Sequence, residues 1–449
     1  MRLTLVCSVT GAVIVALDGT VLSVVQPALQ RDLDASVTQV QWTSTGYLIA
    51  VASLLVLAGR LGDRYGHLRI FAIGMLGFGA ASAGIGLAPG IGWVIGLRVA
   101  QGVFGALLQP ATLGMLRAAY PPDRLGTPIA LRTSAIGVAA AAGPLVGGAL
   151  ATPFGWRSVF WLNVVPAVVL GALALALARE ARVAPDRGGA PRVGLDLPGA
   201  GLLAITSAGL VHALAGASGT GWPTAAGTAL TVIAGAAFVR HLRRTPDPLV
   251  PPAVLRSGTV AAALAVLVAA SAAMFGTLFV ATYFLQDVLG LDPLRTALWG
   301  LPGPAMMVLG APLAAVSARR HGPRRTVGGG MVLLALGIGL FAGLDRTATA
   351  PAVGACFVLI GAGFGAVMMT ATAVVVRHAA VAHAGVAGGL QQTAMNIGPM
   401  LGVAAATALM AREANGAAGS PLLPLAAVAA LGAFLAIRLP APVLPERDP

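Results

Sequence analysis

"LTLVCSVTGAVIVALDGTVLSVVQP", residues 3–27, is an apolar stretch in which Asp18 is the only ionisable side chain. An apolar run of about 18 residues or more is long enough to cross the hydrocarbon core of a bilayer, about 30 Å thick. A carboxylate near the middle of such a helix costs about 2.5–3.5 kcal/mol on insertion scales. The stretch therefore predicts a membrane-spanning helix in which Asp18 has a partner or a function.

The rest of the chain has the composition of a membrane protein. Of its 449 residues, 57% are hydrophobic and only 10% are charged, and the mean hydropathy is +0.88. A soluble protein carries about 25% charged residues. We predict an all-α polytopic membrane protein with fourteen spans, over residues 3–27, 40–58, 70–88, 91–116, 127–152, 157–178, 197–217, 222–240, 259–286, 296–318, 326–343, 350–376, 384–411 and 421–438.

The basic residues indicate the orientation, because cytoplasmic loops carry the excess of positive charge. All 28 basic residues are arginine. With the N-terminus inside, the cytoplasmic segments hold 22 of them and the external segments hold 5, and Arg98 lies within a span. The distribution predicts a bacterial cytoplasmic-membrane protein with both termini in the cytoplasm. It also accounts for the net charge of +13, so nucleic acid is not an expected partner.

The chain resembles itself at a spacing near 256 residues. Three pairs of segments match in order, "DRYGHLR" (63–69) with "RRHGPRR" (319–325), "VFGALLQPATLGMLR" (103–117) with "GFGAVMMTATAVVVR" (363–377), and "GPLVG" (143–147) with "GPMLG" (398–402). They predict two copies of a six-helix unit.

We therefore expect an N-terminal six-helix bundle over residues 1–178 and a C-terminal bundle with a short tail over residues 259–449. Residues 179–258 form a linker that holds two extra transmembrane helices. Repeats of this kind are typical of secondary transporters, whose substrate sites lie near the bilayer midplane. The ionisable residues of the membrane interior, Asp18 and Arg98, both belong to the first copy.

Glycines and charges alternate in "GRLGDRYGHLR", residues 59–69, which joins the second and third spans on the cytoplasmic side. The glycines permit a tight turn, and the acid is suited to the positive end of a helix in the other half. A solvated basic turn that serves only topology is the alternative. The stretch resembles the loop signature of the major facilitator superfamily, which implies a conformational latch between the halves. The residues that fit are Gly59, Asp63, Arg64, Gly66 and Arg69, whereas Leu68 departs from the usual base.

Four polar residues and a glycine recur every three or four positions along the fourth span, so they share one helix face. They are Arg98, Gln101, Gly105, Gln109 and Thr112. A charged face on a spanning helix lines a cavity or meets another polar group, and an arginine that snorkels outward is the alternative. The segment resembles the Arg-x-x-Gln-Gly signature of proton-coupled members of the same superfamily.

The fifth span contains "AIGVAAAAGPLVGG", residues 135–148, with a face of small residues and a proline. Close helix packing explains such a face by itself. The stretch also resembles the Gly-Pro-x-x-Gly-Gly signature of exporters in the superfamily, which implies an antiport-type helix. The positions concerned are Gly137, Gly143, Pro144, Gly147 and Gly148.

The opening stretch is similar to the first-span signature of the fourteen-span drug:proton antiporter family. Leu17, Asp18, Thr20 and Pro27 match that signature, whereas Ser23 and Gln26 depart from it. "QWTSTGYLIA" (41–50) and "GWRSVFWLN" (155–163) resemble the second and sixth spans of the family. The resemblance covers the chain nearly end to end and implies drug or antibiotic efflux.

Asp18 and Arg98 are predicted to lie at similar depths. Asp18 is roughly 13 Å and Arg98 roughly 10 Å from the outer ends of their spans, at 1.5 Å per residue. Burial favours a protonated carboxyl group, and a nearby guanidinium favours its ionised form. We hypothesise that the two residues pair and carry out proton coupling. A fixed pair that only joins the first and fourth spans is the alternative.

Amides on the spans are the candidates for lining a substrate cavity. They are Gln101, Gln109, Gln392 and Asn396. Each alone is more often an interhelical hydrogen bond than a ligand contact.

The sequence favours a proton-coupled exporter of small apolar or amphipathic compounds. A metabolite importer of the same fold is the first alternative, and a membrane-embedded enzyme or a channel is less favoured. We expect no catalytic residues, metal or cofactor, and the proton gradient as energy source. The expected partners are a small-molecule substrate, protons and the lipid bilayer, with the chain acting as a monomer.

Overall fold

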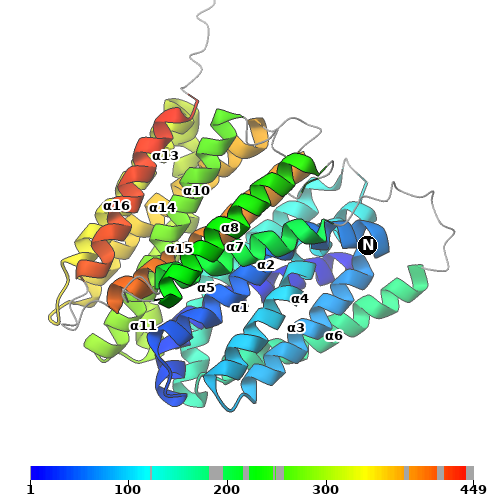
Figure 1. Ribbon diagram of the computed structural model, residues 1–449, viewed down its shortest axis with the longest axis horizontal. Coiled ribbons are helices and arrows are strands. Elements are labelled where there is room, and N and C mark those ends of the chain that lie inside the picture. The colour runs from blue at the N-terminus through cyan, green and yellow to red at the C-terminus, as the bar shows by residue number, and fades with distance from the viewer. Residues whose placement is uncertain are drawn as a thin grey trace, which may run out of the picture. The chain divides into compact units, whose positions relative to one another are not determined.

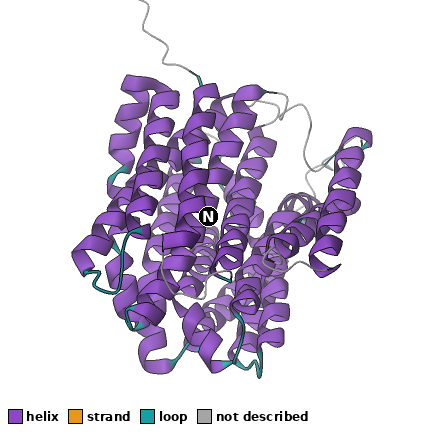
Figure 2. Cartoon of the chain, turned by 60° about the vertical axis from the view of Figure 1, so that its left-hand side comes forward, coloured by secondary structure: helices purple, strands orange, loops and turns teal. Residues whose placement is uncertain are grey.

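The computed structural model describes residues 2–121, 124–181, 196–215, 222–245, 248, 257–378, 384–411 and 419–440. Within these ranges the chain consists of helices joined by turns and loops, without a strand (Figure 2). Contacts divide the chain into two units. The first comprises Met1–Leu249 with Leu291–Ala297, and the second comprises Val250–Gly290 with Leu298–Pro449.

The helices of the first unit are drawn from blue to green in Figure 1. They include α1 (Arg2–Asp32), α2 (Val37–Tyr65), α3 (His67–Gly86), α4 (Ile91–Ala119), α5 (Gly126–Phe154), α6 (Ser158–Ala181), α7 (Leu197–Ala215) and α8 (Trp222–Arg244). The main packing pairs are α1 with α5, α2 with α4, and α3 with both α4 and α6. The extra helices α7 and α8 pack on each other, and α7 packs on α2. The predicted bundle boundaries stay a prediction.

The second unit continues with α10 (Gly258–Tyr283), η3 (Phe284–Val288), α12 (Pro302–Leu309), α13 (Ala311–Ala342), α14 (Ala350–His378), α15 (Ala384–Met410), α16 (Gly419–Leu435) and η5 (Ala436–Arg438). Helix α11 (Pro293–Gly300) precedes α12. The main pairs are α10 with α15, α13 with α14 and α16, and α12 with α14.

Local sequence explains where several helices begin and end. Ser36 begins α2 with a capping box, in which its hydroxyl accepts from the backbone N–H of Gln39 and the Gln39 side chain accepts from the Ser36 N–H. Gly66 ends α2 with φ 92°. Glycine suits this position, because residues with a side chain rarely adopt that backbone conformation. Asp196 caps α7 by accepting from the N–H of Gly199 at 2.9 Å.

Among the described residues, twelve helices are long and apolar enough to cross a membrane. Fourteen spans were expected, and the difference lies at two places. The predicted span 197–217 is α7, of which the apolar part, Leu197–Ala213, is shorter. The predicted span 296–318 does not form a single helix, because the structure divides this stretch among α11, α12 and the beginning of α13, and its crossing of the membrane stays a prediction.

Prolines and glycine account for the divided stretch. Pro302 and Pro312 lie in the first turns of α12 and α13, where a missing N–H costs no hydrogen bond. Gly310 separates the two helices. Hydropathy alone shows an unbroken apolar run here, because the prolines and glycines that divide the helix are themselves weakly polar residues.

The internal repeat is visible in the backbone. Gly66 follows α2 with φ 92° and ψ 128°, and Gly322 kinks α13 with φ 81° and ψ 164°. These two glycines occupy matching positions of "DRYGHLR" and "RRHGPRR". The predicted repeat therefore corresponds to a shared turn conformation that glycine permits.

Small residues bring matching helix pairs together in both units. A Cβ on Gly147 would lie 2.9 Å from the carbonyl oxygen of Val21, so α5 packs directly on the backbone of α1. A Cβ on Gly398 would lie 2.8 Å from the carbonyl oxygen of Val268, which joins α15 to α10 in the same way. Both glycines belong to the "GPLVG" and "GPMLG" segments of the repeat.

Candidate functional site

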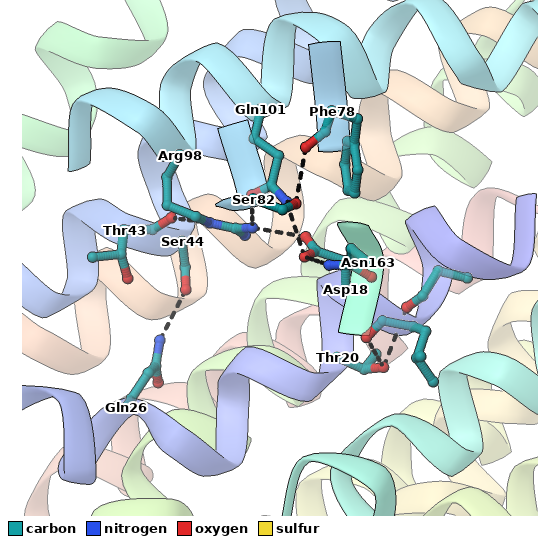
Figure 3. A network of polar contacts seen from close by, with 12 residues as sticks. Asp18, Thr20, Gln26, Thr43, Ser44, Phe78, Ser82, Arg98, Gln101 and Asn163 are labelled. Atoms are coloured by element: carbon teal, nitrogen blue, oxygen red, sulfur yellow. Dashed lines mark hydrogen bonds and ion pairs between the residues drawn. The ribbon is translucent and has the colours of Figure 1, made fainter. Parts of the chain in front are cut away.

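Asp18 is buried in the middle of α1, with its side chain 3% exposed (Figure 3). Its Oδ2 accepts a hydrogen bond from Nη1 of Arg98 at 2.7 Å. Its Oδ1 accepts from the amide nitrogens of Gln101 at 3.1 Å and Asn163 at 2.8 Å. Three donors on two oxygens stabilise an ionised carboxylate away from water.

Arg98 on α4 is equally buried and makes contacts on several sides. Its side chain is 2% exposed, and its Nε donates to the backbone carbonyl of Thr43 on α2 at 3.0 Å. The guanidinium carbon lies 4.4 Å from the centroid of the Tyr47 ring, a cation–π distance. Arg98 therefore does not snorkel outward. It pairs with Asp18, as their depths suggested, while its role in proton coupling stays a prediction.

Gln101 joins the two charged groups. Its Oε1 accepts from Nη1 of Arg98 at 2.5 Å, and its Nε2 donates to Asp18 and, at 2.8 Å, to the hydroxyl of Ser82 on α3. A guanidinium offers only donors and a carboxylate only acceptors, so these neighbours fix the orientation of the amide. The sequence placed Gln101 among the cavity candidates, whereas the structure places it in this fully buried network.

Sequence reasoning missed Asn163 and Ser82. Asn163 is 2% exposed and is a lone amide in the apolar helix α6. An amide in an apolar run was the available signal in the sequence, since a buried amide needs a hydrogen-bond partner. Ser82 gave none, because its hydroxyl also bonds the carbonyl of Phe78 in its own helix. We refer to the five connected side chains as the Asp18 network. They are Asp18, Ser82, Arg98, Gln101 and Asn163.

The other cavity candidates lie elsewhere. Gln109 is two turns along α4 from Gln101 and is half-buried. In the second unit, Gln392 is half-buried and Asn396 is 7% exposed, both on α15. The Nδ2 of Asn396 has no hydrogen-bond partner among the described residues. A substrate cavity that these residues share stays a prediction.

The loop predicted to act as a latch forms the tight turn between α2 and α3. Oδ1 of Asp63 lies 3.3 Å from Nε2 of His67, and the Asp63 side chain is 68% exposed. The Arg64 guanidinium lies over the Tyr65 ring at 5.3 Å. Gly59, one turn before Asp63, remains within α2, and Arg69 lies in the first turn of α3. Contacts of this loop with the other half stay a prediction.

The small-residue face of α5 divides into contact and open positions. A Cβ on Gly143 would collide with the hydroxyl of Thr20 on α1, and one on Gly148 would lie 2.7 Å from the Cα of Leu294. A Cβ on Gly137 would meet nothing within 4 Å. The helix continues through Pro144. Close packing thus involves the Gly-Pro-x-x-Gly-Gly segment and not Gly137.

Similar proteins are found in species of Streptomyces and Mycolicibacterium. The chain is 39% identical over 414 residues to a tetracenomycin C resistance and export protein of Streptomyces glaucescens, covering 91% of this chain and 76% of that protein. It is 35% identical to a puromycin resistance protein of Streptomyces alboniger, with 89% and 80% covered. It is 31% identical to the multidrug efflux pump LfrA of Mycolicibacterium smegmatis, with 87% and 77% covered.

A crystal structure of the peptide transporter POT in complex with sulfate shares the fold, with a TM-score of 0.70 at 14% identity over 97% of this chain and 93% of that one. Residues 9–403 match the family described as Major Facilitator Superfamily, and residues 298–448 match it a second time. With its many apolar helices, its internal repeat and these matches, the chain is a multi-pass membrane protein that belongs to the Major Facilitator Superfamily.

Proposed function

We propose that the protein is a proton-coupled antiporter that exports small apolar or amphipathic compounds, in the manner of drug and antibiotic efflux. The names of its relatives, which describe resistance and export, support the direction of transport and the substrate class. The buried Asp18 network is the observation that carries the coupling mechanism.

Proton uptake by Asp18 changes what its neighbours need. A proton on Oδ1 turns that oxygen from an acceptor into a donor, which requires an acceptor nearby. Gln101 supplies one if its amide turns over and presents Oε1 to Asp18. The turned amide then presents Nε2 to Arg98, which also has only donors. Arg98 therefore loses the charge of the carboxylate and its Gln101 acceptor in one step.

Release of Arg98 connects the proton to the conformational cycle. The guanidinium keeps the Thr43 carbonyl and the Tyr47 ring as partners, both on α2. Its ion pair with α1 is replaced by a neutral hydrogen bond between Asp18 and Gln101, so α1 is held less tightly to α4 and can move relative to it. In the proposed cycle, Asp18 takes its proton from outside and releases it inside, and the substrate leaves in the opposite direction.

Two further elements have roles in this proposal. The loop with Gly59, Asp63, Arg64, Gly66 and Arg69 acts as a latch between the halves. The close crossing of α5 on α1 transmits the movement of α1 along the bundle. Gln109, Gln392 and Asn396 line the substrate cavity.

The proposal includes a membrane arrangement. We assign fourteen spans, counting α7 and the divided stretch 293–321, in the bacterial cytoplasmic membrane with both termini in the cytoplasm. Residues 441–449 lie outside the described part of the chain. The protein works as a monomer without a cofactor, driven by the proton gradient, and is not an enzyme.

The test is proton movement in proteoliposomes that hold an imposed pH gradient. Wild-type protein, Asp18→Asn and Asp345→Asn receive the same panel of antibiotics and dyes. We expect at least one compound to trigger proton flux in the wild type and in Asp345→Asn, whose carboxylate lies in an exposed loop. Asp18→Asn should bind the compound and show no triggered flux.

Two outcomes contradict the proposal. Equal flux in Asp18→Asn and the wild type would make the Asp18–Arg98 pair structural. Absence of triggered flux across a broad panel in the wild type would remove proton-coupled export itself. Size-exclusion chromatography and thermal unfolding verify that the variants are folded.

A further inference from the structure

Arg132 is a second arginine that the helices of the first unit hold inside the bundle. It lies on α5, and its guanidinium is directed at α4. Its Nε and Nη2 donate to the hydroxyl of Thr112 at 3.0 and 2.8 Å, and Nη2 also approaches the carbonyl oxygen of Gln109 at 3.4 Å. The side chain is half-buried, so part of it is accessible.

The guanidinium of Arg132 is not directed toward the nearest ends of α4 and α5. Arg132 lies six residues after the start of α5, roughly 9 Å into the helix at 1.5 Å per residue. Thr112 and Gln109 lie seven and ten residues before the end of α4, roughly 10 and 15 Å from that end. Since a snorkelling side chain would bond groups nearer the helix end, Arg132 is held level with its own backbone or deeper.

Charge balance distinguishes Arg132 from Arg98. Arg98 is neutralised by Asp18, whereas the bonds of Arg132 go to a hydroxyl and a carbonyl oxygen, and no carboxylate pairs with it within the described part of the chain. Its Nη1 makes no hydrogen bond there either. A cation that is partly removed from water inside a helix bundle is costly unless it has an anionic partner, and a guanidinium edge fits the two oxygens of a carboxylate.

We propose that Arg132, held in place by the Thr112 hydroxyl and the backbone carbonyl of Gln109, binds an acidic oxygen of the exported compound, such as a carboxylate, phenolate or enolate. The inference rests on the proposed function, because the ligand is taken to be the exported compound. Thr112 and Gln109 lie on α4, the helix that also carries Arg98 and Gln101 of the Asp18 network. This site gives the transporter a preference for acidic over cationic amphipathic compounds. The Thr112 hydroxyl orients the guanidinium through Nε and Nη2. The edge of the guanidinium that carries Nη1 contacts the substrate.

The experiment measures binding without a proton gradient. Purified protein in phosphatidylcholine nanodiscs is dialysed against three pairs of aromatic probes, each a carboxylate and its neutral amide, built on naphthalene, anthracene and anthraquinone rings. We expect at least one acid to bind about tenfold more tightly than its amide, the range for a charge-assisted hydrogen bond. Arg132→Gln should abolish the difference, and Arg132→Lys should keep part of it.

A matched control separates the site from general charge. Arg117→Gln removes the same charge from the exposed last turn of α4 and should leave the acid preference unchanged. Because binding is measured without a proton gradient, binding and proton coupling can fail independently. If proton flux is absent but the preference depends on Arg132, the acid site stands and antiport does not.

Three results would overturn the inference. The wild type could bind no acid more tightly than its amide, or Arg132→Gln could keep the preference. Loss of the preference on adding phosphatidylglycerol to the nanodiscs, dependent on Arg132, would assign the site to a lipid phosphate instead. Circular dichroism establishes that each variant is folded.

Discussion

A carboxylate at Asp18 is compatible with the membrane interior because its two oxygens receive three N–H donors from α4 and α6. Replacing such a pair by apolar residues is often neutral for stability, whereas removing one partner costs about 3–5 kcal/mol. The Asp18 network therefore stabilises the unit only as a complete set. The proposed change of protonation at Asp18 would give the network a function besides packing.

The sequence predicted the Asp18–Arg98 contact but not the rest of the network. Counting residues from the span ends gives depth, and two opposite charges at one depth in one bundle attract each other. Depth does not show which face of a helix is turned inward, so the sequence did not predict that Asn163 of α6 contacts Asp18. An amide suits a ligand and an ion pair equally well, so the sequence alone does not decide between these two roles for Gln101.

Asn163 should contribute to the stability of the first unit. Asn163→Leu leaves Oδ1 of Asp18 with one donor fewer, at a site that is closed to water. A hydrogen bond to a charged group contributes about 1.5–3 kcal/mol, so we expect a loss of stability of that order in thermal unfolding in detergent. Ser158→Ala, at the start of α6, is the control. An equal melting temperature for Asn163→Leu and the wild type would contradict the prediction.

At the scale of elements, glycine spacing predicted close packing of the fifth span but not its extent. The structure uses Gly143, Gly147 and Gly148 as contacts and leaves Gly137 in open space. A small residue lets another helix approach on whichever face it occupies, so the sequence does not show which face of α5 contacts a neighbour. The same limit applies to the predicted span 296–318, where helix-starting prolines inside an apolar run divided the element.

Gly147 and Gly137 form a matched pair for a stability test. An added Cβ at Gly147 would lie 2.9 Å from the carbonyl oxygen of Val21, a backbone atom that cannot move alone. Gly147→Ala should therefore destabilise the protein by about 1–3 kcal/mol. Gly137→Ala should be neutral or slightly stabilising, because alanine favours helix by about 1 kcal/mol over glycine. Thermal unfolding in detergent measures both, and equal melting temperatures would contradict the proposed crossing.

At the scale of the whole molecule, three short sequence matches were enough to predict the repeat. Gly66 and Gly322 share a left-handed backbone, and glycines of the matching segments GPLVG and GPMLG join α5 to α1 and α15 to α10. These features are local, so a sequence match preserves them. The span count is not local, since it depends on whether α7, α8 and the divided stretch cross the bilayer.

Reporter fusions test the fourteen-span arrangement. Alkaline phosphatase fused after Gly219, between α7 and α8, should be active, because the proposed arrangement places that point outside the membrane. A fusion after Arg244, at the end of α8, should be inactive. An inactive Gly219 fusion, with a fluorescent cytoplasmic reporter at the same position, would show that α7 and α8 do not cross and would favour twelve spans.

The Asp18–Arg98 pair also has a consequence for the order of biosynthesis. The two residues are separated by 80 positions, so at about 5–20 residues per second the ribosome makes Arg98 roughly 4–16 s after Asp18. Asn163 follows 65 positions later still. During this interval α1 enters the membrane with a carboxylate that has none of its final donors. The first helix therefore depends on the insertion machinery, or on a temporary proton, until the fourth helix arrives.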